Sequence, residues 1–219
     1  MARKPQQNVR VGWARASRAI AAAGDDKLVW PEFGNEADAP SCYRLKITLA
    51  DVRPAVWRRI EILGDTTLSR LHRMFQATMG WEDSHLHVFR MNGLQYGALN
   101  PELPFLNEKR VRIDEVAGTP RQRFTYLYDF GDHWLHNVVV ESISPAHPDT
   151  TYPRFVDGRG ACPPEDVGGP PGYESFVAIN ADQSHPEHAR MREWVGSRFD
   201  PAALDIDGIT SSLRRFRRR

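Results

Sequence analysis

Cysteine is scarce in this chain, because Cys42 and Cys162 are the only two. Two cysteines are too few for a disulfide framework or a zinc ribbon, and such a count is typical of a reducing compartment. Long apolar runs are also missing: stretches such as residues 138–140 are far shorter than the ~20 residues that a membrane helix requires. No secretory hydrophobic segment occurs near the first residue. We therefore expect a cytoplasmic, soluble protein with no contact to membranes.

The chain also lacks a strong net charge, but the balance of +1 conceals an uneven distribution. Residues 1–24 contain five basic side chains and no acidic one, and five arginines stand near the C-terminus. The part between them holds 19 of the 29 basic residues and all 28 acidic ones, so it is negatively charged. Any affinity for nucleic acid should therefore reside in the ends of the chain, unless these are simply solvated. The five C-terminal arginines are Arg214, Arg215, Arg217, Arg218 and Arg219.

Hydrophobic periodicity predicts an α+β domain over residues 41–206, with a mainly antiparallel sheet packed by helices. A basic, poorly ordered extension should precede it over 1–40, and an Arg-rich tail should follow over 207–219. The best helix signal runs from residue 68 to 79, where apolar residues recur at helical spacing up to Gly80. The other expected elements are strands over 43–49 and 55–62 joined by a hairpin across 51–54, a hairpin at Asn92-Gly93, extended segments over 123–128 and 134–143, coil over 144–172, and helices over 173–179 and 186–195.

Two histidines two residues apart form the first candidate site. His85 and His87 lie in a segment that we expect to be extended, where such positions point to the same face about 6.5–7 Å apart. That spacing allows two imidazoles to bind one metal ion. A half-exposed strand that carries two histidines on its polar face would give the same pattern.

The turn between the two later extended segments forms the second candidate site. Asp129, Asp132 and His136 lie within eight residues around a Gly turn, in the stretch YLYDFGDHWLH. Oxygen and nitrogen donors at a hairpin tip would suit Zn²⁺, Mn²⁺ or Mg²⁺. Alternatively, aspartates at such a turn bind nearby backbone amides and have only a structural role.

A long loop rich in Gly and Pro supplies the third candidate site. Glu165 and Asp166 stand at the centre of GRGACPPEDVGGPPGY, from residue 158 to 173. Long loops in compact chains are commonly functional, and neighbouring carboxylates can bind a cation or act as a general base. Glu165 could equally pair with Arg159. Cys162 has no histidine near it in sequence, which disfavours a thiol nucleophile.

Together these stretches resemble a known family. The blocks RPAVWRRIEI, TLSRLHRMFQATMGW, HLHVF, YLYDFGDHWLH and GACPPEDVGGPPGYESF are similar, in order and spacing, to the plasmid pRiA-type ORF-three-like family, whose members are also labelled insertion-element passenger TnpR proteins. The resemblance covers about residues 43–205 and implies a single bacterial α+β domain, associated with plasmids and mobile elements. It implies no catalytic residues. The sequence itself does not show the N-terminal nucleophilic serine and arginine cluster of a serine recombinase.

Two functional hypotheses follow. The first is a non-enzymatic accessory or interaction module of mobile elements, which contacts nucleic acid or a protein partner through its Arg-rich ends and an exposed sheet face. The second is a metal-dependent hydrolase or phosphodiesterase that uses a divalent ion. At least three of the expected ligands within ~5 Å of a common point would favour the second hypothesis. The expected ligands are His85, His87, Asp129, Asp132, His136, Glu165 and Asp166.

Overall fold

The computed structural model describes residues 40–196 and 198–217. The predicted basic extension therefore lies outside the described residues except for residue 40, and so do Arg218 and Arg219. Among the helices of the described residues, none is both long enough and apolar enough to cross a membrane.

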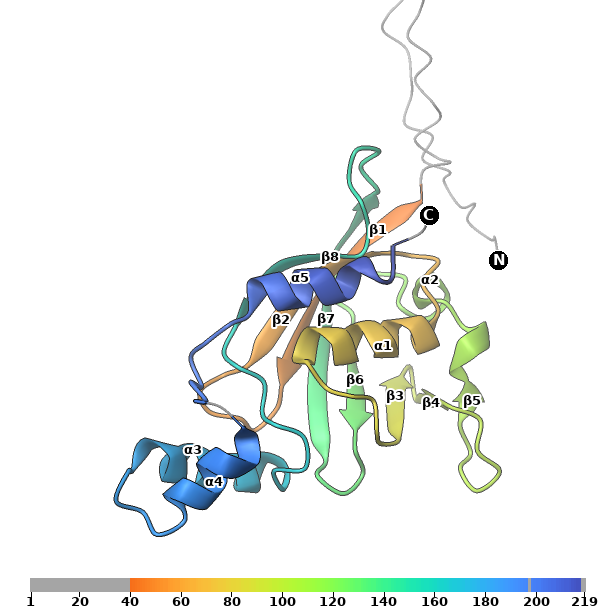
Figure 1. Cartoon of the computed structure of the whole chain (residues 1–219). Coiled ribbons are helices and arrows are strands. Elements are labelled where there is room, and N and C mark those ends of the chain that lie inside the picture. The colour runs from red at the N-terminus through yellow and green to blue at the C-terminus, as the bar shows by residue number, and fades with distance from the viewer. Residues whose placement is uncertain (1–39, 197, 218–219) are drawn as a thin grey trace, which may run out of the picture. The chain divides into compact units, whose positions relative to one another are not determined.

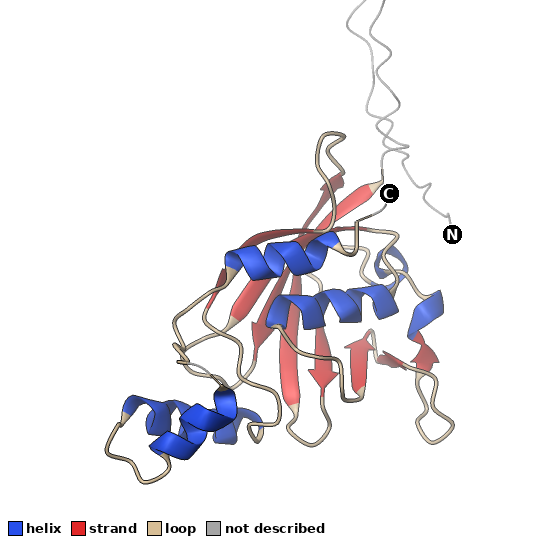
Figure 2. Cartoon of the chain, in the orientation of Figure 1, coloured by secondary structure: helices blue, strands red, loops and turns tan. Residues whose placement is uncertain are grey.

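One eight-stranded sheet organises the domain, with the strand order β5-β4-β3-β6-β7-β1-β2-β8. Neighbouring strands are antiparallel except β4 and β5, which are parallel, so the predicted α+β class with a mainly antiparallel sheet is confirmed. Helices α1 and α5 lie over one face of this sheet (Figures 1 and 2). The strands are β1 (Ser41–Leu49), β2 (Trp57–Leu63), β3 (His87–Met91), β4 (Leu94–Gly97), β5 (Leu106–Asn107), β6 (Arg123–Tyr128), β7 (Trp134–Pro145) and β8 (Arg154–Arg159).

The first two strands confirm the hairpin that alternation predicts. Leu45 and Ile47 are fully buried on one face of β1, and polar residues alternate with them. Leu45 pairs with Ile60 of β2, which is also fully buried. Side chains two residues apart share a face of a strand, so the apolar set of each strand enters the same core.

Helix α1 (Leu68–Met79) covers the sheet as its periodicity predicts. The Thr67 side chain accepts a hydrogen bond from the Arg70 amide at the N-terminus. Gly80 ends the helix in the left-handed conformation, where its amide donates to the Gln76 carbonyl. Leu71 and Phe75 of α1 are fully buried and belong to the main hydrophobic core.

Two further hairpins are also confirmed. Asn92 and Gly93 both take positive φ between β3 and β4, as a tight turn requires. Strands β6 and β7 pair antiparallel, and the pair nearest their turn is Tyr128 with Trp134. The turn between them, residues 129–133, therefore lies at one end of the sheet. Short elements follow β5, namely the 3-10 helix η2 (Glu108–Arg110) and helix α2 (Ile113–Val116).

The segment expected to be coil over 144–172 contains a strand, so that expectation is wrong in part. Strand β8 pairs antiparallel with β2 and forms the edge of the sheet. The Arg154 side chain binds Glu61 of β2 at 2.6 Å, and Arg44 of β1 binds the same carboxylate at 2.7 Å. Backbone pairing with β2 and the Arg154–Glu61 ion pair fix β8, and neither is visible in a local pattern rich in turn formers.

Three helices complete the chain. Helices α3 (Gly169–Ala181) and α4 (His188–Val195) appear where helices are expected, although α3 begins earlier. Helix α5 (Ile206–Arg214) occupies most of the segment that we expected to be an Arg-rich tail. The Asp205 side chain accepts from the Gly208 amide at its N-terminus, and Ile209 and Leu213 are buried. Residues up to 214 therefore belong to the packed domain.

Candidate functional site

Three segments that are distant in the sequence meet at one end of the sheet. They are the loop after α1, the β6–β7 turn and the loop that precedes α3. Trp81 Nε1 donates to the Pro163 carbonyl at 2.9 Å, which ties the first segment to the third. The Asp129 amide donates to the Leu86 carbonyl at 2.9 Å, which ties the second segment to the first. These two hydrogen bonds therefore place the polar side chains of all three segments together.

The three ligand atoms of His85, Asp129 and Asp166 lie within 4.8 Å of one another, and we name these residues the outer group. His85 Nε2 lies 3.0 Å from Asp166 Oδ1 and 3.8 Å from Asp129 Oδ2. The side chain of Asp129 is 12% exposed, whereas that of Asp166 is 70% exposed. The outer group is consequently anchored on one side and open to water on the other.

Asp129 is held in place by its own turn. Its Oδ1 accepts from the Gly131 amide at 2.8 Å, and its carbonyl accepts from the His133 amide at 2.7 Å. Asp129 and Asp166 both have a φ near +60°, in the left-handed region that Asp tolerates better than most residues. Oδ2 of Asp129 remains directed to His85.

Tyr128 and Glu165 form a buttress beside the outer group. The Tyr128 hydroxyl donates to Glu165 Oε1 at 2.5 Å and accepts from the Ser84 amide at 3.0 Å. Burial, followed by the hydrogen bond with Glu165, raises the pKa of Tyr128 well above its usual value. The other oxygen of Glu165 accepts from the Glu82 amide at 2.7 Å. Glu165 therefore fixes the loop that carries Asp166.

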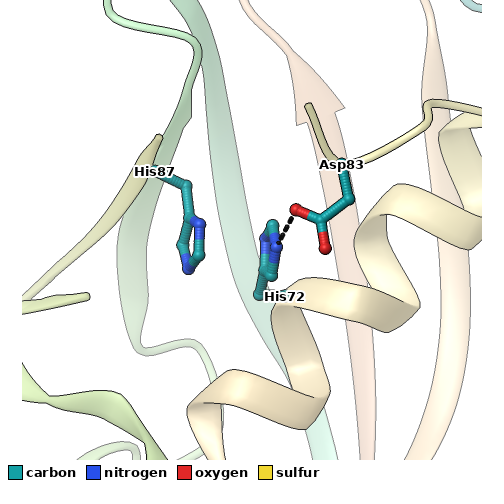
Figure 3. A group of neighbouring side chains, drawn as sticks. All are labelled: His72, Asp83 and His87. Carbon is teal, nitrogen blue, oxygen red and sulfur yellow. Dashed lines mark hydrogen bonds and ion pairs between the residues drawn. The ribbon is translucent and has the colours of Figure 1, made fainter. Parts of the chain in front are cut away.

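A second set of side chains, His72 of α1, Asp83 of the following loop and His87 of β3, lies nearby, and we name it the inner group (Figure 3). The two imidazole rings are stacked, with centroids 3.4 Å apart and planes 6° from parallel. His72 Nε2 lies 2.6 Å from Asp83 Oδ1. Both histidines are buried, whereas the side chain of Asp83 is 42% exposed.

Each imidazole of the inner group has a second polar partner. His87 Nε2 lies 2.7 Å from the carboxylate of Glu108, which is itself buried. His72 Nδ1 lies 2.7 Å from the Tyr126 hydroxyl. Burial lowers the pKa of His72, and the hydrogen bond with Asp83 opposes that effect without reversing it. His72 is therefore mainly neutral near pH 7.

The structure separates several ligands that we expected to converge. His85 and His87 do not face one ion, because His87 starts β3 and faces α1, whereas His85 precedes the strand and faces the β6–β7 turn. Asp132 does not join either group, and its Oδ2 accepts from the Gly168 amide at 3.1 Å.

His136 and Glu165 do not join a metal-ligand group either. His136 is fully buried in the core, where its Nδ1 donates to the Trp134 carbonyl at 2.9 Å. Glu165 is engaged by Tyr128 and the Glu82 amide as described above. Of the expected ligands, the outer group thus unites His85, Asp129 and Asp166.

The sequence did not point to His72 and Asp83 of the inner group, nor to the neighbouring Glu108. His72 stands on the apolar face of α1, and a histidine at such a position is the signal that could have marked it. Asp83 and Glu108 lie in irregular segments without a motif. Their proximity depends on how the loops pack, so no spacing in the sequence indicates it.

The described C-terminal arginines differ in how exposed they are. Arg214 and Arg215 are exposed and Arg217 is half-buried. Phe216, which lies between them, has its ring 5.9 Å from the Arg73 guanidinium, and its carbonyl accepts from Arg70. The described part of the Arg-rich segment is therefore attached to α1.

Comparison with known proteins places the fold and leaves the activity open. The model of a family described as plasmid pRiA4b ORF-3-like protein matches residues 41–208. The uncharacterized protein y4hQ of Sinorhizobium fredii is 41% identical over 177 residues, which cover 79% of this chain and 91% of that protein. The crystal structure of MM3350 from Methanosarcina mazei, a protein of unknown function, superposes with a TM-score of 0.71 at 34% identity, covering 77% of this chain and 97% of that one.

Proposed function

The chain belongs to the plasmid pRiA4b ORF-3-like family, and we propose that it is a divalent-metal-dependent hydrolase whose ion is bound by the outer group. The observation that carries this proposal is the convergence of His85, Asp129 and Asp166 from three distant segments. The narrower grouping with TnpR passenger proteins stays a prediction from sequence resemblance.

The donor set of the outer group suits a specific class of ion. One imidazole nitrogen and two carboxylate oxygens are ligands for Mn²⁺ or Zn²⁺, whereas Mg²⁺ and Ca²⁺ prefer oxygen alone. A cation would also compensate the two neighbouring carboxylates, which otherwise repel each other. In the described residues, neither Asp129 nor Asp166 forms an ion pair with an arginine or lysine.

The surroundings of the outer group support hydrolysis. A groove of about 370 Å³ lies along α3 and α4, and Asp166 is one of its lining residues. Phe176, Met191 and Trp194 supply apolar walls, and Arg190, which forms an ion pair with Glu187, also lines the groove. A phosphoester in this groove could reach an ion at Asp166. A divalent ion held by His85, Asp129 and Asp166 would lower the pKa of its bound water, and the resulting hydroxide would attack phosphorus while the departing alcohol takes up a proton.

Replacing Asp166 with asparagine should remove the ion of the outer group. We expect the stripped, untagged full chain to bind one fewer Mn²⁺ per molecule after Asp166→Asn, as measured by calorimetry and elemental analysis. Hydrolysis of bis(p-nitrophenyl) phosphate should fall at least tenfold. The loss follows because an amide oxygen is a weaker, uncharged ligand.

A matched substitution separates this effect from general charge loss. Asp149 is exposed on another loop, so Asp149→Asn should leave both Mn²⁺ binding and hydrolysis unchanged. Equal Mn²⁺ stoichiometry and equal hydrolysis in Asp166→Asn and the parent protein would contradict the proposal.

Nucleic-acid contact through the Arg-rich segment is the second candidate function, favoured by the exposed side chains of Arg214 and Arg215. We expect the replacement of Arg214, Arg215, Arg218 and Arg219 by glutamine to weaken binding to a DNA duplex at least tenfold in 50 mM salt. Binding by the parent protein should fall steeply between 50 and 200 mM salt, because phosphate contacts release counterions. Fluorescence anisotropy measures both effects.

The control for this experiment uses arginines that are exposed elsewhere. Arg90 and Arg110 are exposed on β3 and η2, so their replacement by glutamine should change DNA affinity little. Similar losses from both sets of substitutions would show that binding is not specific to the C-terminal segment. The protein partner expected from the sequence stays a prediction.

A further inference from the structure

We infer that the inner group is a second metal site, which binds a first-row transition-metal ion such as Zn²⁺ through His72, Asp83 and His87. Their three ligand atoms lie within 4.8 Å of one another. Two imidazoles and one carboxylate form a donor set that is typical of zinc and non-haem iron centres with open coordination positions. This site does not share a ligand with the outer group, so the inference stands independently of the proposed function.

The residues around the inner group hold one nitrogen of each imidazole by a hydrogen bond. In the tautomer in which His87 Nε2 donates to the Glu108 carboxylate, Nδ1 carries the lone pair. This carboxylate–histidine contact is the usual partner of a histidine that binds metal through its other nitrogen. Tyr126 holds His72 Nδ1, and Gln76 in turn donates to the Tyr126 hydroxyl at 2.8 Å. Nε2 of His72 lies 2.6 Å from Asp83 Oδ1 and donates to it; this nitrogen would bind an ion once its proton is lost and Nδ1 carries the proton toward the Tyr126 hydroxyl.

Charge also favours a cation at this position. Asp83 and Glu108 contribute two carboxylates. Within the described part of the chain, neither forms an ion pair with an arginine or a lysine. A divalent ion would supply the missing positive charge.

The stacked rings make a specific demand on metal binding. A ring nitrogen binds a metal with a lone pair in the plane of the ring, so an ion bound to both histidines requires the parallel rings to turn apart (Figure 3). Asp83 lies on a loop and is partly exposed, which gives the ion and its water molecules access. Binding should therefore change the magnetic environment of both imidazoles.

Zinc titration of a protein without the outer ligand set tests the inference. In the Asp166→Asn full chain, stripped of metal, we expect calorimetry to detect one Zn²⁺ per molecule. Adding Asp83→Asn should weaken this binding at least tenfold, whereas adding Asp157→Asn, on β8, should not change it. Asp83 is partly exposed, so its replacement should preserve the fold, which circular dichroism verifies.

The nitrogen atoms that bind Zn²⁺ can be identified directly. We expect the ¹⁵N resonances of His72 Nε2 and His87 Nδ1 to shift on addition of Zn²⁺ to the Asp166→Asn chain. Equal Zn²⁺ affinity with and without Asp83→Asn, or shifts confined to His85, would overturn the inference. Loss of the first ion in Asp166→Asn tests the outer group alone, so the two outcomes are distinguishable.

Discussion

Replacing Arg58 with alanine is expected to lower the free energy of unfolding by about 3–5 kcal/mol. The Arg58 side chain belongs to β2 and is only 2% exposed. Its Nε donates to the Thr78 carbonyl at 2.9 Å, and its Nη1 donates to the carbonyls of Trp57 and Arg159 at 2.9 and 3.0 Å. One guanidinium therefore joins β2, the end of α1 and the end of β8.

The large loss of stability in Arg58→Ala follows from the buried carbonyl groups that lose their donor. Burial lowers the pKa of Arg58, and in the described residues no carboxylate pairs with it, so backbone carbonyls supply its electrostatic stabilisation. Thr78 lies in the last turn of α1, where the helix dipole favours a positive charge. Alanine would leave buried carbonyl groups without a donor and would open a cavity beneath α1.

Arg59 provides the matched control, because it is the next residue on β2 and points to the opposite face. It pairs with Glu141 at 2.6 Å and with Asp157 at 3.1 Å on a partly exposed surface. Surface ion pairs contribute about 0–1 kcal/mol, so Arg59→Ala should have a small effect. Urea unfolding followed by circular dichroism measures both variants. Equal losses would contradict the role of Arg58.

The sheet and its main helix were predictable because their signals are local. The alternation around Leu45 and Ile47 and the helical spacing around Leu71 and Phe75 each reflect burial on one face. Strand β8 was not predictable in the same way, because its position depends on the free edge of β2. Helix α5 does carry a local signal, since Ile206, Ile209 and Leu213 recur at helical spacing after the N-cap residue Asp205. The run of arginines that follows obscured this signal.

The candidate site was predictable only where turn chemistry marked it. Asp129 and Asp166 stand in short polar motifs at turns, and His85 stands just before a strand. The convergence of His85 and Asp129 was not predictable, because it depends on the pairing of β3 with β6, which sets His87 opposite Tyr128. In a single sequence, a histidine on the apolar face of a helix, such as His72, cannot be distinguished from an ordinary core residue. Its partner Asp83 comes from a loop.

Lowering the pH from 7 to 5 should destabilise the protein through His136 by about 2 kcal/mol. Burial lowers the pKa of His136 to about 4, although hydrogen bonds to the carbonyls of Tyr126 and Trp134 partly oppose the effect. The ring is fully buried, and Nε2 has no hydrogen-bond partner within the described residues. Protonation in the folded state would bury an unpaired charge among the aromatic rings of Trp81 and Tyr126.

The direction of this pH effect follows from the lowered pKa. The unfolded chain, in which histidine titrates near its usual pKa of about 6.5, binds the proton first as the pH falls. The contribution of neutral His136 to stability is therefore complete above about pH 6.5 and is lost progressively as the pH falls toward 4. Carboxylates that titrate in the same range also change the stability, so a variant without the imidazole is needed as a reference.

His136→Asn isolates this contribution, because the asparagine amide can still donate to the Trp134 carbonyl but does not titrate. We expect the variant to lose about 2 kcal/mol less than the parent between pH 7 and 5, as measured by urea unfolding at each pH. His147 is exposed, and its replacement by asparagine should leave the parental pH dependence intact. If His136→Asn and the parent lost the same free energy, the buried imidazole would not be the group that titrates. The core around Trp134 would then tolerate protonation, and acid destabilisation would have to arise from the carboxylates.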